Sequence, residues 1–117
     1  MTFNRGDVVL VLYPEPDLRT AKRRPALVIH ADGFTDRLPM VIVALISSDP
    51  ARAGYPSRVA LSPDTDDGKS AGLLTQSVIM TDNLATVLER HVDRVLGTLS
   101  RPLMHAVDQA LRYSLGL

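Results

Sequence analysis

The sequence predicts a mainly β fold of the α+β class: a small, curled, mainly antiparallel barrel that ends in one α-helix. Several short aliphatic runs are separated by turn-forming residues, and only the C-terminal stretch has helical periodicity. The chain has 117 residues, 45% of them hydrophobic, which is enough for one domain with a modest core. We therefore expect a single domain over residues 1–117.

The first two expected strands are apolar runs joined by a polar, basic loop. Residues 8–12 are a continuous aliphatic run, typical of a strand that is covered on both faces. Pro14 and Pro16 end this run. Because a proline cannot donate a ladder hydrogen bond, Pro25 suits the first residue of the next strand, which we expect at residues 26–29.

The middle of the chain alternates between loops and strands in the same way. A polar loop at residues 31–39 precedes residues 40–46, the most apolar strand. Residues 62–71 contain three aspartates and predict an acidic, mobile loop. Residues 84–88 fit either a helical turn or a short strand. Further strands are expected at residues 58–61, 72–80 and 92–98, with a bulge at Gly97.

The last segment is the one convincing helix. Ser100 is a suitable N-cap, Pro102 is tolerated in the first turn, and Gly116 fits the helix end. One stripe at helical spacing is expected to be buried, formed by Leu103, Ala106, Val107, Ala110, Leu111 and Ser114.

Composition excludes several classes of function. The chain lacks cysteine, so it has no disulfide scaffold, thiolate zinc site or cysteine nucleophile. Its formal net charge is zero, so any binding of nucleic acid must be local to one surface. We see no signal peptide and no apolar run near the ~20 residues that span a bilayer. A cytoplasmic protein without membrane contact is therefore expected.

Motifs for phosphate-loop ATPases and serine esterases are absent. The aspartate-rich segment from Asp64 does not fit a calcium loop, because Thr75 stands where a bidentate glutamate is needed. His30, His91 and His105 lack metal-ligand spacing, so no metal site is expected. A pair of histidines sharing acid and base roles stays open, as does an approach of His30 to a site near the basic loop.

Basic and hydroxyl side chains remain as the candidates for a phosphate clamp. A solvated loop is an equal alternative for three of the basic residues, and a simple turn is the alternative for the serines. Arg24 differs, because the proline that follows it restrains its backbone. The candidate residues are Arg19, Lys22, Arg23 and Arg24, with Ser47 and Ser48.

Five short motifs occur in a fixed order along nearly the whole chain. They are GDVVLV at residues 6–11, RPALVI at residues 24–29, ALISS at residues 44–48, AGLLTQS at residues 71–77 and LGTLS at residues 96–100, with Asp17 and Lys22 between the first two. Together these motifs are similar to those of the PemK/MazF family of toxin–antitoxin ribonucleases.

The resemblance implies an SH3-like barrel that forms a homodimer and cuts single-stranded RNA, including mRNA, without metal or other cofactor. It also implies a cognate antitoxin protein that blocks the RNA groove. The family's catalytic arginine falls on Arg24 and its catalytic threonine on Ser47. Residues implied to contact RNA are Arg19, Lys22, Arg23, Ser48 and Gln76.

This implied chemistry agrees with the residues present. RNA supplies its own nucleophile, the 2′-hydroxyl, and the products are a cyclic phosphate and a free 5′-hydroxyl. Because a guanidinium stays protonated at neutral pH, we expect Arg24 to stabilise charge on the phosphate. The base that removes the 2′-hydroxyl proton is left open between water, an unidentified side chain and Arg24 itself.

The chain also departs from the family pattern, mainly at Glu15 and Pro16 in the first loop, at Ser47 in place of threonine, and at His30 in place of serine. Two alternatives therefore stay open. One is a toxin of the same fold that acts by binding, as the gyrase-poisoning relatives do. The other is a catalytically inactive relative that keeps its antitoxin partner.

Overall fold

The computed structural model describes residues 2–34 and 38–117, and six strands in this part of the chain form one antiparallel sheet. The strand order is β4-β5-β3-β2-β1-β6. The strands are β1 (Asp7–Pro14), β2 (Ala21–Val28), β3 (Met40–Ser47), β4 (Arg58–Leu61), β5 (Ser77–Leu88) and β6 (Val92–Thr98). The helices are α1 (Asp66–Ser70) and α2 (Arg101–Leu115), with single 3₁₀ turns at η2 (Pro50–Arg52) and η3 (Glu89–His91).

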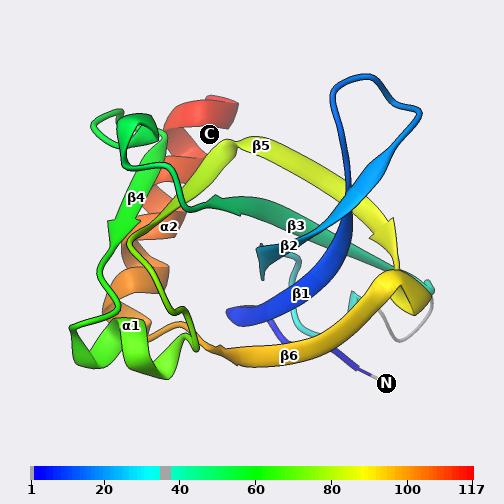
Figure 1. Ribbon diagram of the computed structural model, residues 1–117, viewed down its shortest axis with the longest axis horizontal. Coiled ribbons are helices and arrows are strands. Elements are labelled where there is room, and N and C mark those ends of the chain that lie inside the picture. The colour runs from blue at the N-terminus through cyan, green and yellow to red at the C-terminus, as the bar shows by residue number, and fades with distance from the viewer. Residues whose placement is uncertain (1, 35–37) are drawn as a thin grey trace.

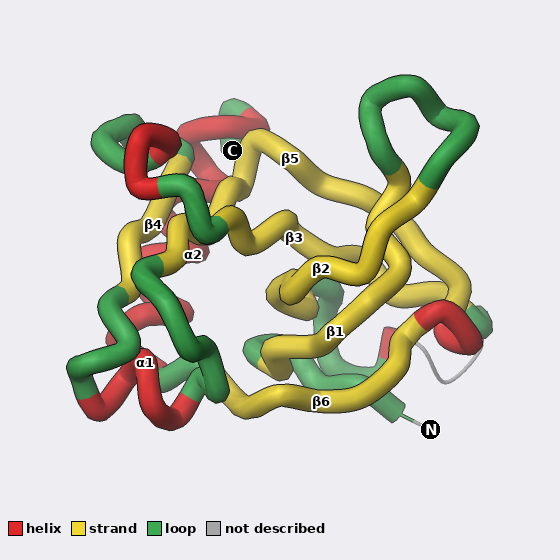
Figure 2. The backbone as a smooth tube through the Cα atoms, viewed as in Figure 1, coloured by secondary structure: helices red, strands yellow, loops and turns green. Residues whose placement is uncertain are grey.

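The sheet is strongly curled but does not close into a barrel, because β4 and β6 remain edge strands (Figure 2). The predicted mainly β fold with a C-terminal helix is confirmed, and the closure of the barrel is not. The segment that follows β4 lies between the two edges in Figure 1. It contacts β6 through a hydrogen bond from the Ser70 hydroxyl to the Thr98 carbonyl, 3.1 Å long.

That connecting segment was expected to be an acidic loop and instead contains helix α1. Thr65 is its N-cap, and its hydroxyl accepts a hydrogen bond from the Gly68 amide at 3.0 Å. Asp66 and Asp67 occupy the first turn, where negative charge is favoured by the helix dipole. Two of the three aspartates thus belong to a capped helix start, and Asp64 precedes the N-cap.

The second strand begins earlier than predicted. β2 starts at Ala21, so Pro25 lies inside the strand, opposite Leu10 of β1. Its position still follows from its missing N–H. β2 pairs with β3 only from Ala26 to Val28, and the ladder stops next to the proline. Pro25 therefore marks the point at which β2 and β3 diverge.

The segment at residues 84–88 is strand, continuous with β5, which bends where its register with β3 shifts. β5 begins at Ser77, later than the predicted residue 72. β6 contains the expected irregularity next to Gly97, where its register with β1 shifts. The predicted loop at residues 31–39 connects β2 to β3, and residues 35–37 of it lie outside the described residues.

The curled sheet has an apolar cluster on each face. One surrounds Val9, Val11 and Val43, and the other lies under α2. α2 is the predicted helix, with Ser100 as its N-cap and Gly116 as its left-handed C-cap. From its predicted stripe Val107, Ala110 and Leu111 are buried, and the Ser114 hydroxyl lies 3.0 Å from that of Thr81 on β5. No helix among residues 2–34 and 38–117 is long and apolar enough to cross a membrane.

Candidate active site

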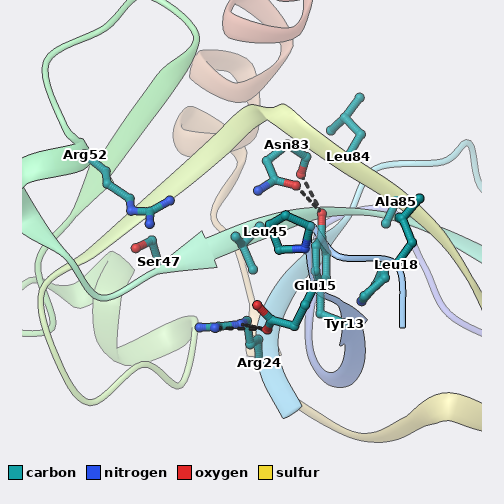
Figure 3. Close-up of a pocket in the computed structure, with 12 residues that line it drawn as sticks. Tyr13, Glu15, Leu18, Arg24, Leu45, Ser47, Arg52, Asn83, Leu84 and Ala85 are labelled. Carbon is teal, nitrogen blue, oxygen red and sulfur yellow. Dashed lines mark hydrogen bonds and ion pairs between the residues drawn. The ribbon is translucent and has the colours of Figure 1, made fainter. Parts of the chain in front are cut away.

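A cavity of about 400 Å³ opens where β2 and β3 diverge, between the β1–β2 loop and the middle of β5. Arg24 and Ser47 both line this cavity, as Figure 3 shows. Their proximity follows from the sheet register. Ala26 pairs with Leu45, so continuing the same register by two residues puts Arg24 opposite Ser47. Both side chains then point to the same face of the sheet.

The Arg24 side chain is held by Glu15 from the β1–β2 loop. Its Nε and Nη2 donate hydrogen bonds to the same Glu15 carboxylate oxygen, Oε1, at 3.2 and 3.1 Å. The Arg24 side chain is 39% exposed and that of Glu15 only 19%. The Arg24 guanidinium is thus oriented by a carboxylate and remains accessible to a ligand.

The loop that carries Glu15 is braced by hydrogen bonds within itself. The Glu15 amide donates to the Thr20 carbonyl at 3.0 Å, and the Leu18 amide donates to the Glu15 carbonyl at 2.9 Å. One Asp17 carboxylate oxygen accepts from the amides of Arg19 and Thr20 at 2.9 and 3.0 Å. Leu18 has a φ of 60°, a left-handed conformation that is unusual for leucine. This loop therefore has a defined shape.

The Asp17 bracing predicts a pH-dependent loop. The amide of Arg19, followed by that of Thr20, lowers the pKa of the Asp17 carboxyl below its usual value. The contribution of Asp17 is therefore complete above the ordinary aspartate pKa and is lost as the pH falls through the lowered one. We expect the backbone amide resonances of Arg19 and Thr20 to shift together in an acid NMR titration. In Asp17→Asn this coupled shift should disappear, and its persistence would contradict the assignment.

The end of β3 supplies a hydroxyl and a second cation. The Ser47 hydroxyl accepts a hydrogen bond from the Asp49 amide at 3.1 Å. Asp49 is also the N-cap of η2, which ends at Arg52. The Arg52 guanidinium lines the same cavity, where its Nε lies 3.8 Å from an Asp49 carboxylate oxygen. In Figure 3 Arg52 and Arg24 lie on opposite sides of Ser47.

A hydrogen-bonded pair, the buried Tyr13 and the partly buried Asn83, forms another wall of the cavity. The Tyr13 hydroxyl is shared between the carbonyl and the side-chain oxygen of Asn83 on β5, at 2.8 and 2.9 Å. Burial raises the pKa of Tyr13 to about 12. Tyr13 is therefore protonated at neutral pH and links the start of the loop to β5.

Sequence reasoning missed Arg52, Tyr13 and Asn83 as members of this site. Arg52 follows Ser47 by only five residues, so a search for basic residues near the proposed hydroxyl would have found it. Asn83 had no such signal, because its position depends on the bend in β5.

The other predicted site residues lie outside this cavity. The Arg23 Nη1 lies 3.9 Å from Asp93, and Arg23 and Ser48 line a second cavity next to Leu74, which Arg24 also borders. Arg19 and Lys22 are exposed on the loop and at the start of β2. The Gln76 amide donates to the Ser62 hydroxyl at 3.2 Å and does not line the cavity of Arg24.

The histidines do not line the cavity either. His30 is buried and stacked on Phe34, with ring centroids 5.1 Å apart, and its Nδ1 lies 2.9 Å from the Ala31 carbonyl oxygen. His91 is in η3, and His105 is exposed on α2. Among the described residues no three histidine, aspartate or glutamate side chains come together as a metal site would require.

The described chain is thus a small curled antiparallel sheet with a C-terminal helix, and one cleft in it is lined by two arginines and Ser47. The model of the PemK-like, MazF-like toxins of type II toxin–antitoxin systems matches residues 4–115. The chain belongs to this family.

Individual relatives match over nearly their full length. Endoribonuclease MazF6 of Mycobacterium tuberculosis is 34% identical over 119 residues, which cover 100% of both chains. Endoribonuclease EndoA of Bacillus subtilis is 31% identical over 118 residues, covering 100% of this chain and 97% of the relative. A mycobacterial endoribonuclease solved with its cognate antitoxin has the same fold, with a TM-score of 0.75 at 22% identity, covering 98% of this chain and 96% of that one.

Proposed function

We propose that this protein is a toxin-type endoribonuclease that cuts single-stranded RNA, including mRNA, at the cavity of Arg24 and Ser47. The observation that carries the proposal is that these two side chains and Arg52 line the same cleft. The chain also belongs to the PemK-like and MazF-like toxins. The relatives named as endoribonucleases support the reaction class.

The cleft has the groups that this reaction needs. The RNA 2′-oxygen attacks the adjacent phosphorus, and the bond from phosphorus to the 5′-oxygen of the next nucleotide breaks. Negative charge grows on the phosphate oxygens, where Arg24 and Arg52 stabilise it as fixed cations. The Ser47 hydroxyl, which accepts a hydrogen bond from the Asp49 amide, donates a hydrogen bond to a phosphate oxygen. The products are a 2′,3′-cyclic phosphate and a free 5′-hydroxyl, formed without metal.

The test is cleavage of a long single-stranded RNA by purified protein in EDTA, with the ends of the fragments mapped. We expect cyclic phosphate and 5′-hydroxyl ends. Ser47→Ala should slow single-turnover cleavage by about 10²-fold, the cost of one lost transition-state donor. Ser47→Thr should retain activity because it keeps the hydroxyl, and Ser48→Ala is the matched control outside the cleft. Intact RNA at large protein excess would contradict the proposal.

We also propose a cognate antitoxin protein as partner and a homodimer as the working form, both in the cytoplasm where mRNA is found. The family description and the mycobacterial complex support the antitoxin. The second cavity supports an apolar contact between copies, since Leu10, Leu74 and Leu96 line it and Leu74 is 93% exposed.

One observation favours a second candidate, an inactive relative that binds its partner without cutting RNA. Glu15 already holds the donors Nε and Nη2 of Arg24 that a phosphate would use. Under this alternative Glu15 blocks the cleft, and the purified protein binds an antitoxin peptide but leaves RNA intact.

A further inference from the structure

The reaction needs a base for the 2′-hydroxyl proton, and few groups in the cleft can accept one. Arg24 and Arg52 are cations, and Tyr13 is protonated at neutral pH. The three histidines lie elsewhere in the described structure. Among the described residues that line the cleft, Glu15 has the only carboxylate or imidazole side chain.

We propose that Glu15 is the general base of RNA cleavage, a proposal that rests on the function proposed above. The carboxylate lies in the cleft directly beside the guanidinium that would hold the scissile phosphate, with 3.1 Å between Glu15 Oε1 and Arg24 Nη2. A 2′-oxygen in line for attack lies about 3–3.5 Å from phosphorus. A phosphate bound to Arg24 would thus place its neighbouring 2′-hydroxyl close to the Glu15 carboxylate.

The loop holds Glu15 in place for this task. Pro14 and Pro16 restrict the backbone on both sides of it, and the Thr20 and Leu18 hydrogen bonds fix its own amide and carbonyl. Arg24 contacts Oε1 alone, so among the described residues Oε2 has no hydrogen bond partner. Oε2 is therefore the oxygen that can accept the 2′-hydroxyl proton.

The proton balance of the step is as follows. Glu15 takes the 2′-hydroxyl proton as the bond between the 2′-oxygen and phosphorus forms. The bond between phosphorus and the 5′-oxygen breaks, and that oxygen takes a proton from a water molecule at the open side of the cleft. The resulting hydroxide is neutralised when Glu15 returns its proton to solvent, which restores the carboxylate. No oxidant, metal or other reactant is required.

The test compares wild type, Glu15→Gln and Glu89→Gln in single-turnover cleavage of RNA in EDTA. Glu89 lines a different cavity, so Glu89→Gln makes the same chemical change outside the cleft. The glutamine in Glu15→Gln keeps an oxygen that accepts from Arg24 but loses the basic carboxylate. We expect Glu15→Gln to reduce kcat by about 10²–10⁴-fold with KM unchanged or lower, while Glu89→Gln cuts like wild type.

A pH profile separates a base from a positioning residue. A general base acts in its unprotonated form, so the wild-type rate should fall toward acidic pH. This acidic limb should be absent in Glu15→Gln, and Glu15→Asp should retain more activity than Glu15→Gln. Cleavage by Glu15→Gln at or above the wild-type rate would overturn the proposal and show that Glu15 only blocks Arg24. Wild type that leaves RNA intact would instead overturn the proposed function.

Discussion

Replacing Arg24 with alanine is expected to reduce the single-turnover rate of RNA cleavage by about 10²–10³-fold or more. Arg24 lines the cleft with Ser47 and is held there by Glu15, and its guanidinium can bind two phosphate oxygens at once. The measurement is cleavage of a labelled single-stranded RNA in EDTA, with the melting temperature recorded to confirm that the variant is folded.

Two variants control for charge and position. Arg24→Lys keeps the positive charge but loses the forked pair of donors, so it should recover only a small part of the rate. Arg23→Ala removes the neighbouring arginine, which points to the other face of β2 and lies 3.9 Å from Asp93. It should raise KM and leave kcat nearly unchanged. A wild-type rate in Arg24→Ala, or an equal loss of kcat in Arg23→Ala, would contradict the assignment.

The sequence allowed Arg24 and Ser47 to be chosen because each belongs to a local motif at the end of an apolar run. Pro25 was interpreted less well. A proline normally begins a strand or lies at an edge, and here it satisfies that rule in the middle of β2, because β2 has no partner on the β3 side beyond Ala26. The same missing donor that misplaced the strand boundary explains why the two strands diverge and leave a cleft.

The parts of the site that the sequence did not predict depend on tertiary structure. Asn83 reaches Tyr13 only because β5 bends at its register shift with β3, and such a bend has no sequence period. Glu15 was recognised only as a departure from the family pattern. Its contact with Arg24 could not be derived, because a loop conformation with Leu18 at positive φ follows no propensity rule.

The open side of the curled sheet predicts the second large effect, which is on stability. Gly72 follows α1 and packs on β6 with a φ of 74°. A Cβ at Gly72 would lie 2.1 Å from the Leu96 carbonyl oxygen, a backbone atom that cannot move aside cheaply. Gly72→Ala should therefore combine backbone strain with overpacking and lower the free energy of unfolding by roughly 3–5 kcal/mol.

Gly54→Ala is the matched control for the cost of backbone strain at positive φ alone. Gly54 also has a positive φ, 94°, but a Cβ there would have no heavy atom within 4 Å. It should cost only about 1–2 kcal/mol. Urea unfolding of both variants, followed by circular dichroism, gives the difference as the cost of the contact between the connecting segment and β6. Equal unfolding midpoints for the two variants would mean that the backbone near Leu96 moves aside at no cost in stability. The close packing of Gly72 on β6 would then not stabilise the fold.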